Sequence, residues 1–430
     1  MTKKKISYGF ATRAIHSGAA PEPITGARNT PIYQTTSYVF KNTEHAERLF
    51  KLEDFGFIYS RLTNPTVSVL EERLANLENS RAAVACSSGH ASQQLAFASL
   101  LSNNDHFIAS DKLYGGSITQ FTKTFKSFGW ETDLVDITNY EEVKQAIKSK
   151  NVRALFAESL SNPEGVVSDI TQLSEIAHDE GIPLIIDNTM ATQAMCQPAN
   201  YGADIIIYST TKFLSGHGNA MGGCVVDTGK FDWANNRGFE KLNEPDTSYH
   251  GIKFYETFGN LAYINFCHAC ALRDLGTTMS PFNAYLTLTG IETLNLRMQK
   301  HMSNAEKVAN FLIKHNKVDA VSWSGFQNNK SYKLAKKYFK FGFGSVFTFS
   351  VKSGYDGAKK VVENCNLFSH LANVGDTKSL IIHPASTTHR QLSSEQREIS
   401  GAGDSVIRLS IGIEHSDDII KDLKTTLDNL

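Results

Sequence analysis

Three groups of polar residues directly follow apolar runs of the sequence. The run PLIID ends in Asp187, and the run ADIIIYS ends in Ser209, which is followed closely by Thr211 and Lys212. The third run, AAVAC, is followed by the segment SSGHAS at 87–92. These residue types offer a carboxylate for a cation, an amine flanked by hydroxyls, and a helix start whose N–H groups can bind an anion.

The segment SSGHAS has a glycine at the position where a helix should begin. Gly89 would let the backbone come close to a ligand, and the N–H groups at a helix N-terminus attract phosphate. An ordinary N-cap with a glycine turn explains the same residues. The segment alone therefore does not establish a ligand site.

The combination of the three groups favours pyridoxal phosphate (PLP) over a nucleotide. The sequence has no GxGxxG motif after a predicted strand and no GxxxxGK[ST] motif, which dinucleotide and Walker-type sites require. PLP needs donors for its phosphate, a carboxylate for its ring nitrogen and a lysine for its aldehyde. A strand-end aspartate or lysine is often only a cap or a solvated residue, but the three groups together indicate this cofactor.

Apolar runs that alternate with helical stretches predict the elements that carry these residues. Helices are predicted from about Ala91 to Leu101 and from the capping residues Asp169 and Gln172 onward. Such alternation predicts an α/β fold with a mostly parallel sheet and helices on both faces, and ligands bind such a sheet at the carboxyl ends of its strands. The predicted strands are 82–86, 106–110, 154–159, 183–187, 203–209 and 222–227.

The pattern changes about two thirds of the way along the chain. Pro281 fits the first turn of a helix, and helical sequence continues to about His315 with a break near Gly290. The runs VFTFSV (346–351) and VIRLSI (406–411) alternate like strands with one solvent-exposed face. We therefore expect an N-terminal arm, a large cofactor-binding domain and an α+β C-terminal domain, over residues 1–60, 61–275 and 276–430.

Composition limits the kinds of partner. The 430 residues carry 43 Lys plus Arg against 44 Asp plus Glu, so the clustered positive charge that binds nucleic acid or an anionic membrane is not expected. No apolar run approaches the ~18 residues that a membrane span needs. Six cysteines are too few for a disulfide framework, and Cys267 and Cys270 lack the second ligand pair of a zinc site. We expect small-molecule substrates, buried thiols, no bound metal, and a reduced, cytoplasmic location.

Seven segments occur in a fixed order along almost the whole chain. They are IYSRLTNPT (58–66), SSGHAS (87–92), DKLYGGS (111–117), FAESLSNPEG (156–165), IIDNTMAT (185–192), YSTTKFLSGHG (208–218) and VIRLSIGIE (406–414). This set resembles the Cys/Met-metabolism family of fold-type I PLP-dependent enzymes. Within it the likeness is closest to the O-acetylhomoserine sulfhydrylases, which share the GFATRAIHSG opening and the segment SLIIHPASTTHRQL at 379–392.

The resemblance implies a role for each matching residue near the cofactor ring. Lys212 is implied to bind PLP covalently as a Schiff base and to move protons on the substrate. Asp187 is implied to pair with the ring nitrogen, Tyr114 to stack on the ring and assist proton movement, and Asn162 to hydrogen-bond the ring oxygen. A buried aspartate keeps its charge only with such a cationic partner.

The resemblance also implies how the phosphate is held. The backbone of Ser88, Gly89 and His90 and the hydroxyls of Ser209 and Thr211 are implied as its ligands. Many relatives carry another residue where His90 stands, which matters little if only the N–H group is used.

Further residues are implied to act from another subunit or on the substrate. Tyr59 and Arg61 should reach the phosphate of a neighbouring subunit, so a monomer would have an incomplete site and we expect an obligate homo-oligomer, a tetramer. Arg408 is implied to bind the α-carboxylate of the substrate, with Ser379 nearby. A structural salt bridge would also explain an arginine in an apolar strand.

Two positions distinguish branches of the family. Gly116 stands where methionine γ-lyases carry a cysteine, and Lys378 stands where cystathionine-handling relatives carry a glutamate. A lysine repels the ammonium group of a cysteine moiety and suits hydrosulfide. The resemblance therefore implies γ-replacement, in which O-acetyl-L-homoserine and sulfide (or methanethiol) give L-homocysteine (or methionine) and acetate. Cystathionine γ-synthase or γ-lyase activity, a non-catalytic PLP-binding role, and a protein-bound thiocarboxylate as sulfur donor stay open as alternatives.

Overall fold

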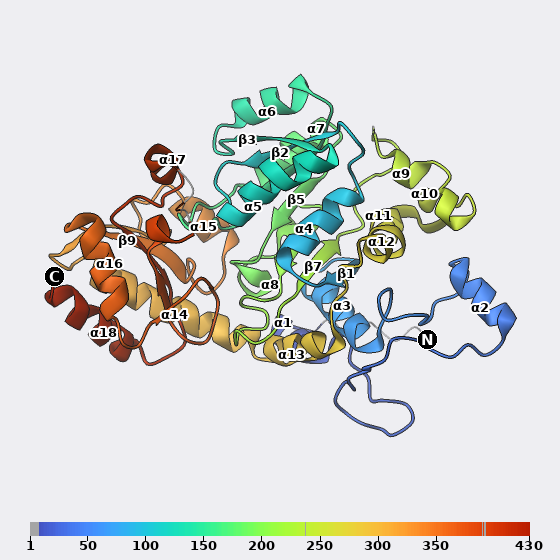
Figure 1. Cartoon of the computed structure of the whole chain (residues 1–430), viewed down its shortest axis with the longest axis horizontal. Coiled ribbons are helices and arrows are strands. Elements are labelled where there is room, and N and C mark those ends of the chain that lie inside the picture. Colours follow the sequence, from blue (N-terminus) through green and yellow to red (C-terminus); the bar gives the residue numbers. More distant parts are fainter. Residues whose placement is uncertain (1–7, 237, 389, 391–392) are drawn as a thin grey trace. The chain divides into compact units, whose positions relative to one another are not determined.

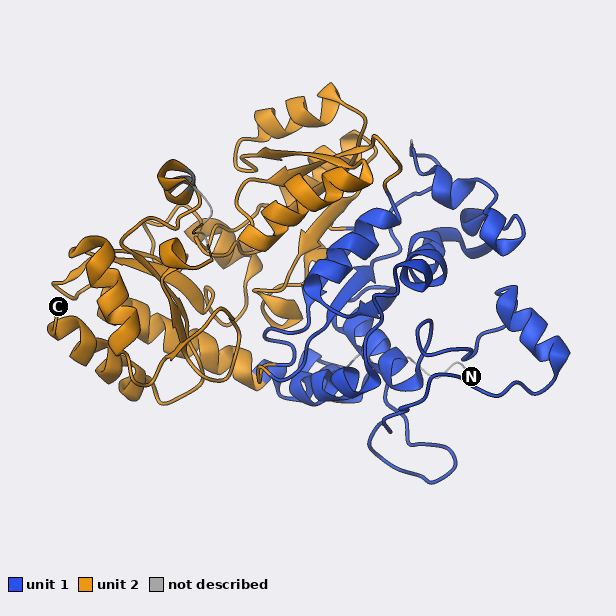
Figure 2. Cartoon of the chain, viewed as in Figure 1, with its two compact units in different colours: residues 1–100, 204–215, 219–295 blue, residues 101–203, 216–218, 296–430 orange. Residues whose placement is uncertain are grey.

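The computed structural model describes residues 8–236, 238–388, 390 and 393–430, so the 379–392 motif lies partly outside the described residues. The chain forms two compact units (Figure 2). Unit 1 contains residues 1–100, 204–215 and 219–295, and unit 2 contains residues 101–203, 216–218 and 296–430. Each unit thus combines distant parts of the sequence. The arm and the two domains predicted from the sequence have boundaries that differ from those of these two units, and the predicted division stays a prediction.

Unit 1 is built on three strands in the order β1 (Ala82–Cys86), β7 (Gly223–Asp227) and β6 (Ile205–Ser209) (Figure 1). Strand β7 is antiparallel to both neighbours. The reason is the connection, because the segment between β6 and β7 is short and forms no crossover helix, which a parallel pair would need. All three strands agree with the sequence prediction to within two residues at each end.

Two capped helices pack on these strands. Helix α3 (Pro65–Leu77) contacts β1, and α4 (Gly89–Ala98) contacts β6 and β7. Helix α4 begins two residues before the predicted start because the Ser88 side chain accepts a hydrogen bond from the N–H of Ala91 at 3.1 Å and caps the helix. The other α-helices of this unit are α1 (Phe10–His16), α2 (Thr43–Phe50), α9 (Glu240–Asn243), α10 (Phe254–Phe258), α11 (Ala262–Phe266), α12 (Arg273–Leu275) and α13 (Pro281–Glu292).

Unit 2 begins with four parallel strands in the order β5-β4-β2-β3. Helix α6 packs on β2 and β3, and α7 packs on β4 and β5. Every residue of β4 is buried, as expected for a strand with both faces covered. The bounds are β2 (His106–Ser110), β3 (Glu131–Val135), α6 (Tyr140–Ser149), β4 (Val152–Glu158), α7 (Ile170–Asp179) and β5 (Leu184–Asp187), with short helices α5 (Gly115–Thr119) and α8 (Thr192–Met195).

A second sheet follows in unit 2, with five strands in the order β10-β11-β12-β9-β8. The expectation that 346–351 and 406–411 have one solvent-exposed face is wrong. Thr348 in β9 and Arg408 and Ser410 in β12 are all at most 5 % exposed, because the polar face of these strands is covered by protein. The elements are α14 (Leu294–Leu312), β8 (Val318–Ser322), α15 (Tyr332–Tyr338), β9 (Val346–Val351), α16 (Gly354–Asn364), β10 (Ser369–His370), β11 (Leu380–Ile382), α17 (Ser394–Ile399), β12 (Val406–Ser410) and α18 (Ser416–Asp428).

Two expectations from composition can be compared with the described residues. The thiols of Cys267 and Cys270 are buried and unpaired, as predicted. In the part of the chain that the structure describes, we find no helix with the length and apolar character that crossing a membrane requires.

Replacing Asp227 with Asn is expected to stabilise the protein at pH 8 much more than at pH 5. Burial raises the pKa of Asp227, at the end of β7, to about 7, against ~3.9 in an unfolded chain. Between these values only the folded state binds the proton, so wild-type stability falls by ~1.4 kcal/mol per pH unit as pH rises toward 7. The free energy of unfolding of the variant lacks this dependence on pH. Relative to the wild type, it should therefore increase by about 3 kcal/mol between pH 5 and pH 8.

Urea denaturation at the two pH values measures the difference. Asp319→Asn, which changes an exposed carboxylate in β8, is the control. Parallel pH curves for wild type and the Asp227 variant would contradict the expectation.

Candidate functional site

Unit 1 brings the predicted phosphate ligands together at the start of α4 and the end of β6. We call Ser88, Gly89, His90, Ser209 and Thr211 the phosphate cradle. A Cβ atom at Gly89 would lie 2.7 Å from the Cβ atom of Ser209, which is closer than packed side chains come. Glycine is therefore needed for the start of α4 to approach the end of β6 this closely, and the helix N-terminus faces the strand-end hydroxyl.

The side-chain oxygens of the cradle already have partners in the protein. The Ser88 oxygen caps α4, so any phosphate contact by Ser88 would come from its backbone, as predicted. The Thr211 hydroxyl donates to the carbonyl of Gly222 at 3.2 Å and accepts from its N–H at 3.0 Å. This pair ties the start of the segment after β6 to the residue just before β7.

Lys212 lies one turn beyond the strand end. Its N–H donates to the carbonyl of Ser209 at 3.3 Å, so the backbone turns back directly after β6. The lysine is partly buried. Lys212 and the hydroxyl residues Ser209 and Thr211 thus belong to one short turn of unit 1.

Tyr59 and Arg61 lie elsewhere on the surface of unit 1. Tyr59 is 42 % exposed, and the Arg61 guanidinium carbon lies 5.6 Å from the centre of its ring. Arg61 also donates to the backbone carbonyl of Arg273. Their contact with the phosphate of a neighbouring subunit stays a prediction.

Unit 2 contains a pair of neighbouring acidic residues at two strand ends. Glu158 ends β4 and Asp187 ends β5, and the two are aligned in the register of these parallel strands. Burial, and then the charge of Asp187, raise the pKa of Glu158 well above its ordinary value. Both effects favour the protonated form of the Glu158 carboxyl group over its charged form.

Glu158 is a buried residue that the sequence analysis did not single out. Its Oε1 accepts the N–H of Tyr114 at 2.7 Å and its Oε2 accepts the N–H of Asn162 at 3.1 Å. One carboxyl group thus fixes the backbone of both residues that are predicted at the cofactor ring. The sequence shows only that Glu158 lies in an apolar run, and its alignment with Asp187 becomes visible in the register of the folded sheet.

Arg408, in the middle of β12, points a buried positive charge at Asn162. It is 5 % exposed, and its Nη1 donates to Asn162 Oδ1 at 3.2 Å while its Nη2 donates to the Asn373 carbonyl at 3.1 Å. Burial lowers the pKa of Arg408 to about 10, so it stays charged at pH 7. No described acidic residue forms an ion pair with it, which favours an external carboxylate over a structural salt bridge.

Ser379, predicted near the substrate carboxylate, lies just before β11 and is bonded to the loop after β12. It is fully buried, and its hydroxyl donates to Glu414 Oε2 at 2.9 Å and accepts the N–H of Gly412 at 2.9 Å. Its own N–H donates to Glu414 as well. These bonds fasten the loop after β12, so a positioning role for Ser379 fits the geometry, and direct contact with substrate stays a prediction.

The residues present fit PLP by their chemistry. Unit 1 supplies an anion-binding helix start, a close approach that requires glycine, and a lysine. Unit 2, taken by itself, contains a carboxyl group at a strand end and a buried guanidinium that suits a carboxylate. A phosphate, a ring cation and an amino-acid substrate each have a matching group.

Comparisons with known proteins agree over the full length. The family model "Cys/Met metabolism PLP-dependent enzyme" matches residues 11–428. An O-acetyl-L-homoserine sulfhydrylase of Leptospira meyeri is 46 % identical over 97 % of this chain and 96 % of its own length, and a homocysteine synthase of Schizosaccharomyces pombe is 44 % identical over 98 % and 99 %. A Campylobacter jejuni structure described as an O-acetylhomoserine (thiol)-lyase, with a pyridoxyl-lysine phosphate residue, is 40 % identical, with a TM-score of 0.95 over 98 % of this chain and 100 % of its own.

Replacing Glu158 with Ala is expected to weaken the retention of PLP at least ~10-fold. The N–H groups of Tyr114 and Asn162 would lose a buried acceptor, which costs about 1–3 kcal/mol for each, and tenfold in affinity corresponds to ~1.4 kcal/mol. Equilibrium dialysis of the cofactor measures this without turnover. The Glu158→Gln side chain keeps one acceptor oxygen, so its retention of PLP should lie between those of the wild type and of Glu158→Ala. Glu175→Ala changes an exposed residue of α7 and should retain PLP; equal retention by the Glu158→Ala protein would contradict the role.

Proposed function

Because the chain belongs to the Cys/Met-metabolism family of PLP-dependent enzymes, we propose that it is an O-acetylhomoserine sulfhydrylase. The supporting observation is its 42–46 % identity, over nearly its full length, to several proteins named for that activity or for homocysteine synthesis. The family and the fold-type I class expected from the sequence are confirmed.

The proposed reaction exchanges one substituent at Cγ of the substrate. O-acetyl-L-homoserine loses acetate as its Cγ–O bond breaks, and hydrosulfide forms a new Cγ–S bond, which gives L-homocysteine. Atoms and charge balance without an oxidant or reductant. Methanethiol in place of hydrosulfide would give methionine.

When bound, PLP supplies an electron sink that makes the proton on Cα of an amino acid removable. In our proposal the carboxylate of Asp187, at the end of β5, pairs with the ring nitrogen and keeps it protonated. The phosphate cradle holds the phosphate, and Tyr114 covers the ring. Glu158 holds Tyr114 and Asn162 in place through their backbone N–H groups.

Proton movement is assigned to Lys212 and substrate orientation to Arg408. Lys212 would remove the proton at Cα and later return one, its position in the turn after β6 supplying proximity. Arg408 would hold the α-carboxylate by a bidentate contact from a site with little water. Tyr114 would assist proton transfer near the leaving acetate.

The alternative reactions within the family either use a different nucleophile, as in cystathionine γ-synthase, or eliminate the leaving group without adding one, as in the γ-lyases. Lys378 is exposed, and its charge suits hydrosulfide better than the ammonium of cysteine, which disfavours cystathionine γ-synthase. Gly116 lies in α5, two residues after Tyr114, without the thiol of the γ-lyases. Both observations support γ-replacement with sulfide.

We further propose a cytoplasmic homotetramer in which Tyr59 and Arg61 complete the phosphate site of a neighbouring subunit. The exposure of Tyr59 and its contact with Arg61 support this, because both side chains are available to another chain. The six cysteines, all within the described residues, form no disulfide, which supports a reducing compartment.

Replacing Lys212 with Ala is expected to abolish turnover and the visible absorbance of the lysine-bound cofactor, because no other residue is assigned to bind the aldehyde. Absorption spectra and a homocysteine assay measure the two effects. Lys333→Ala, an exposed lysine of α15, is the matched control. A coloured and active Lys212→Ala protein would refute the assignment.

Product analysis should identify the substrate pair. We expect O-acetylhomoserine with sulfide to give homocysteine faster than O-succinyl- or O-phosphohomoserine, and sulfide to be a better acceptor than cysteine. Mass spectrometry of the products with sulfide, methanethiol and cysteine measures this. Cystathionine or 2-oxobutyrate as the main product would assign the chain to another branch of the family.

A further inference from the structure

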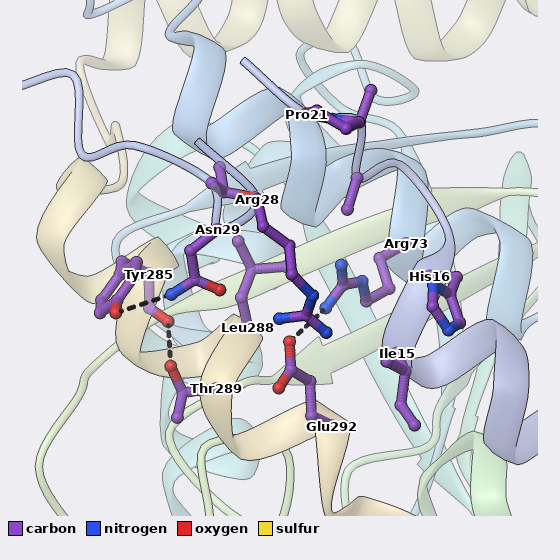
Figure 3. A pocket seen from close by; sticks show the side chains of 13 residues that line it. Ile15, His16, Pro21, Arg28, Asn29, Arg73, Tyr285, Leu288, Thr289 and Glu292 are labelled. Atoms are coloured by element: carbon purple, nitrogen blue, oxygen red, sulfur yellow. Dashed lines mark hydrogen bonds and ion pairs between the residues drawn. The ribbon is translucent and has the colours of Figure 1, made fainter. Parts of the chain in front are cut away.

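A cavity of about 280 Å³ lies in unit 1, between the N-terminal segment and α13 (Figure 3). Its charged residues come from three parts of the chain: Arg28, Arg73 on α3 and Glu292 at the end of α13. None of them belongs to the phosphate cradle or to the residues assigned to the cofactor and substrate. The volume is at the low end of the roughly 300–1,000 Å³ of small-molecule pockets.

The base of the cavity contains a buried guanidinium that is not fully paired. Arg73 is 2 % exposed, and its Nε donates to the carbonyl of Ser17 at 2.9 Å. Its Nη1 is buried without a hydrogen-bond partner and lies 3.8 Å from Glu292 Oε1, which is an ion pair beyond hydrogen-bond distance. A buried charged donor with no acceptor is costly, so this atom is suited to an acceptor from outside the chain.

Charges of both signs meet around this atom. A dashed line in Figure 3 joins Arg73 to Glu292, and Arg28 lines the same cavity. The group has two positive charges and one negative charge. An inorganic anion would be repelled by Glu292, and a simple amine would be repelled by the arginines.

Apolar side chains also line the cavity. Leu288 of α13 and Ile15 of α1 lie on either side of the charged groups in Figure 3, and Leu288 is buried. A ligand that matches both the charged and the apolar lining has a carboxylate, an ammonium group and an apolar side chain.

We propose that this cavity binds a small α-amino acid as its zwitterion. The carboxylate accepts from Nη1 of Arg73 and from Arg28, the ammonium group donates to Glu292, and the side chain packs on Leu288 and Ile15. The cavity is a second amino-acid site, separate from catalysis, and its occupant would link the N-terminal segment to α3 and α13.

Binding is tested on the full-length holoenzyme after borohydride reduction, so that no amino acid can condense with the cofactor. The probe is L-norleucine, which has no leaving group at Cγ, compared by isothermal titration with hexanoate and pentylamine, which lack the ammonium group and the carboxylate. We expect norleucine to bind at least ~10-fold more tightly than either analogue, since each loses a charge-assisted contact.

Two variants on the rim avoid the risk that changing Arg73 unfolds the protein. Arg28→Gln and Glu292→Gln should each raise the Kd of norleucine at least ~10-fold. The matched controls Arg48→Gln and Glu44→Gln remove the same charges from an exposed ion pair of α2 and should bind like wild type. No heat of binding, an unchanged Kd in both rim variants, or hexanoate bound as tightly as norleucine would each overturn the proposal. Because turnover is not measured, failure here leaves the proposed function untouched.

Discussion

The alignment of Glu158 and Asp187 at neighbouring strand ends is the constraint on which the arrangement around β4 and β5 depends. Two carboxyl groups at aligned strand ends cannot both ionise at low cost, and burial, together with the charge of Asp187, raises the pKa of Glu158 well above its ordinary value. Glu158 also accepts hydrogen bonds from two backbone N–H groups, those of Tyr114 and Asn162. The register of two parallel strands therefore places a structural acceptor directly beside the carboxyl group of Asp187.

Local sequence signals predicted much of the fold. The runs AAVAC and HFIAS became β1 and β2 without any shift, because a buried strand shows itself as a continuous apolar run. The predicted start of α4 lies two residues too far along the chain. The apolar periodicity becomes visible only after the first helical residues that follow the N-cap Ser88. The prediction that one face of β9 and β12 is exposed to solvent was wrong for another reason. Alternation in the sequence indicates which face of a strand is polar, but a polar face can be buried when its groups form hydrogen bonds within the protein.

The candidate site was predicted less completely than the fold. Asp187, at the end of β5, and Lys212, three residues after β6, could be named as candidates from position alone, because ligands bind parallel sheets at the carboxyl ends of their strands. Glu158 was missed since its role depends on register, and register between strands far apart in sequence is not visible in either strand. Arg73 was missed for a similar reason. An arginine in an amphipathic helix suggests a solvated residue, and only the packed structure shows Nη1 buried.

The antiparallel pairing of β6 with β7 has a mechanical consequence for the lysine. Both ends of the intervening segment are held by adjacent strands, and the Thr211–Gly222 contact closes it again from within. A segment closed in this way has little backbone freedom left to lose, so the backbone of Lys212 is held close to the end of β6. Surface connections usually tolerate gains and losses of residues, whereas a change in the length of this segment would alter the position of Lys212 directly.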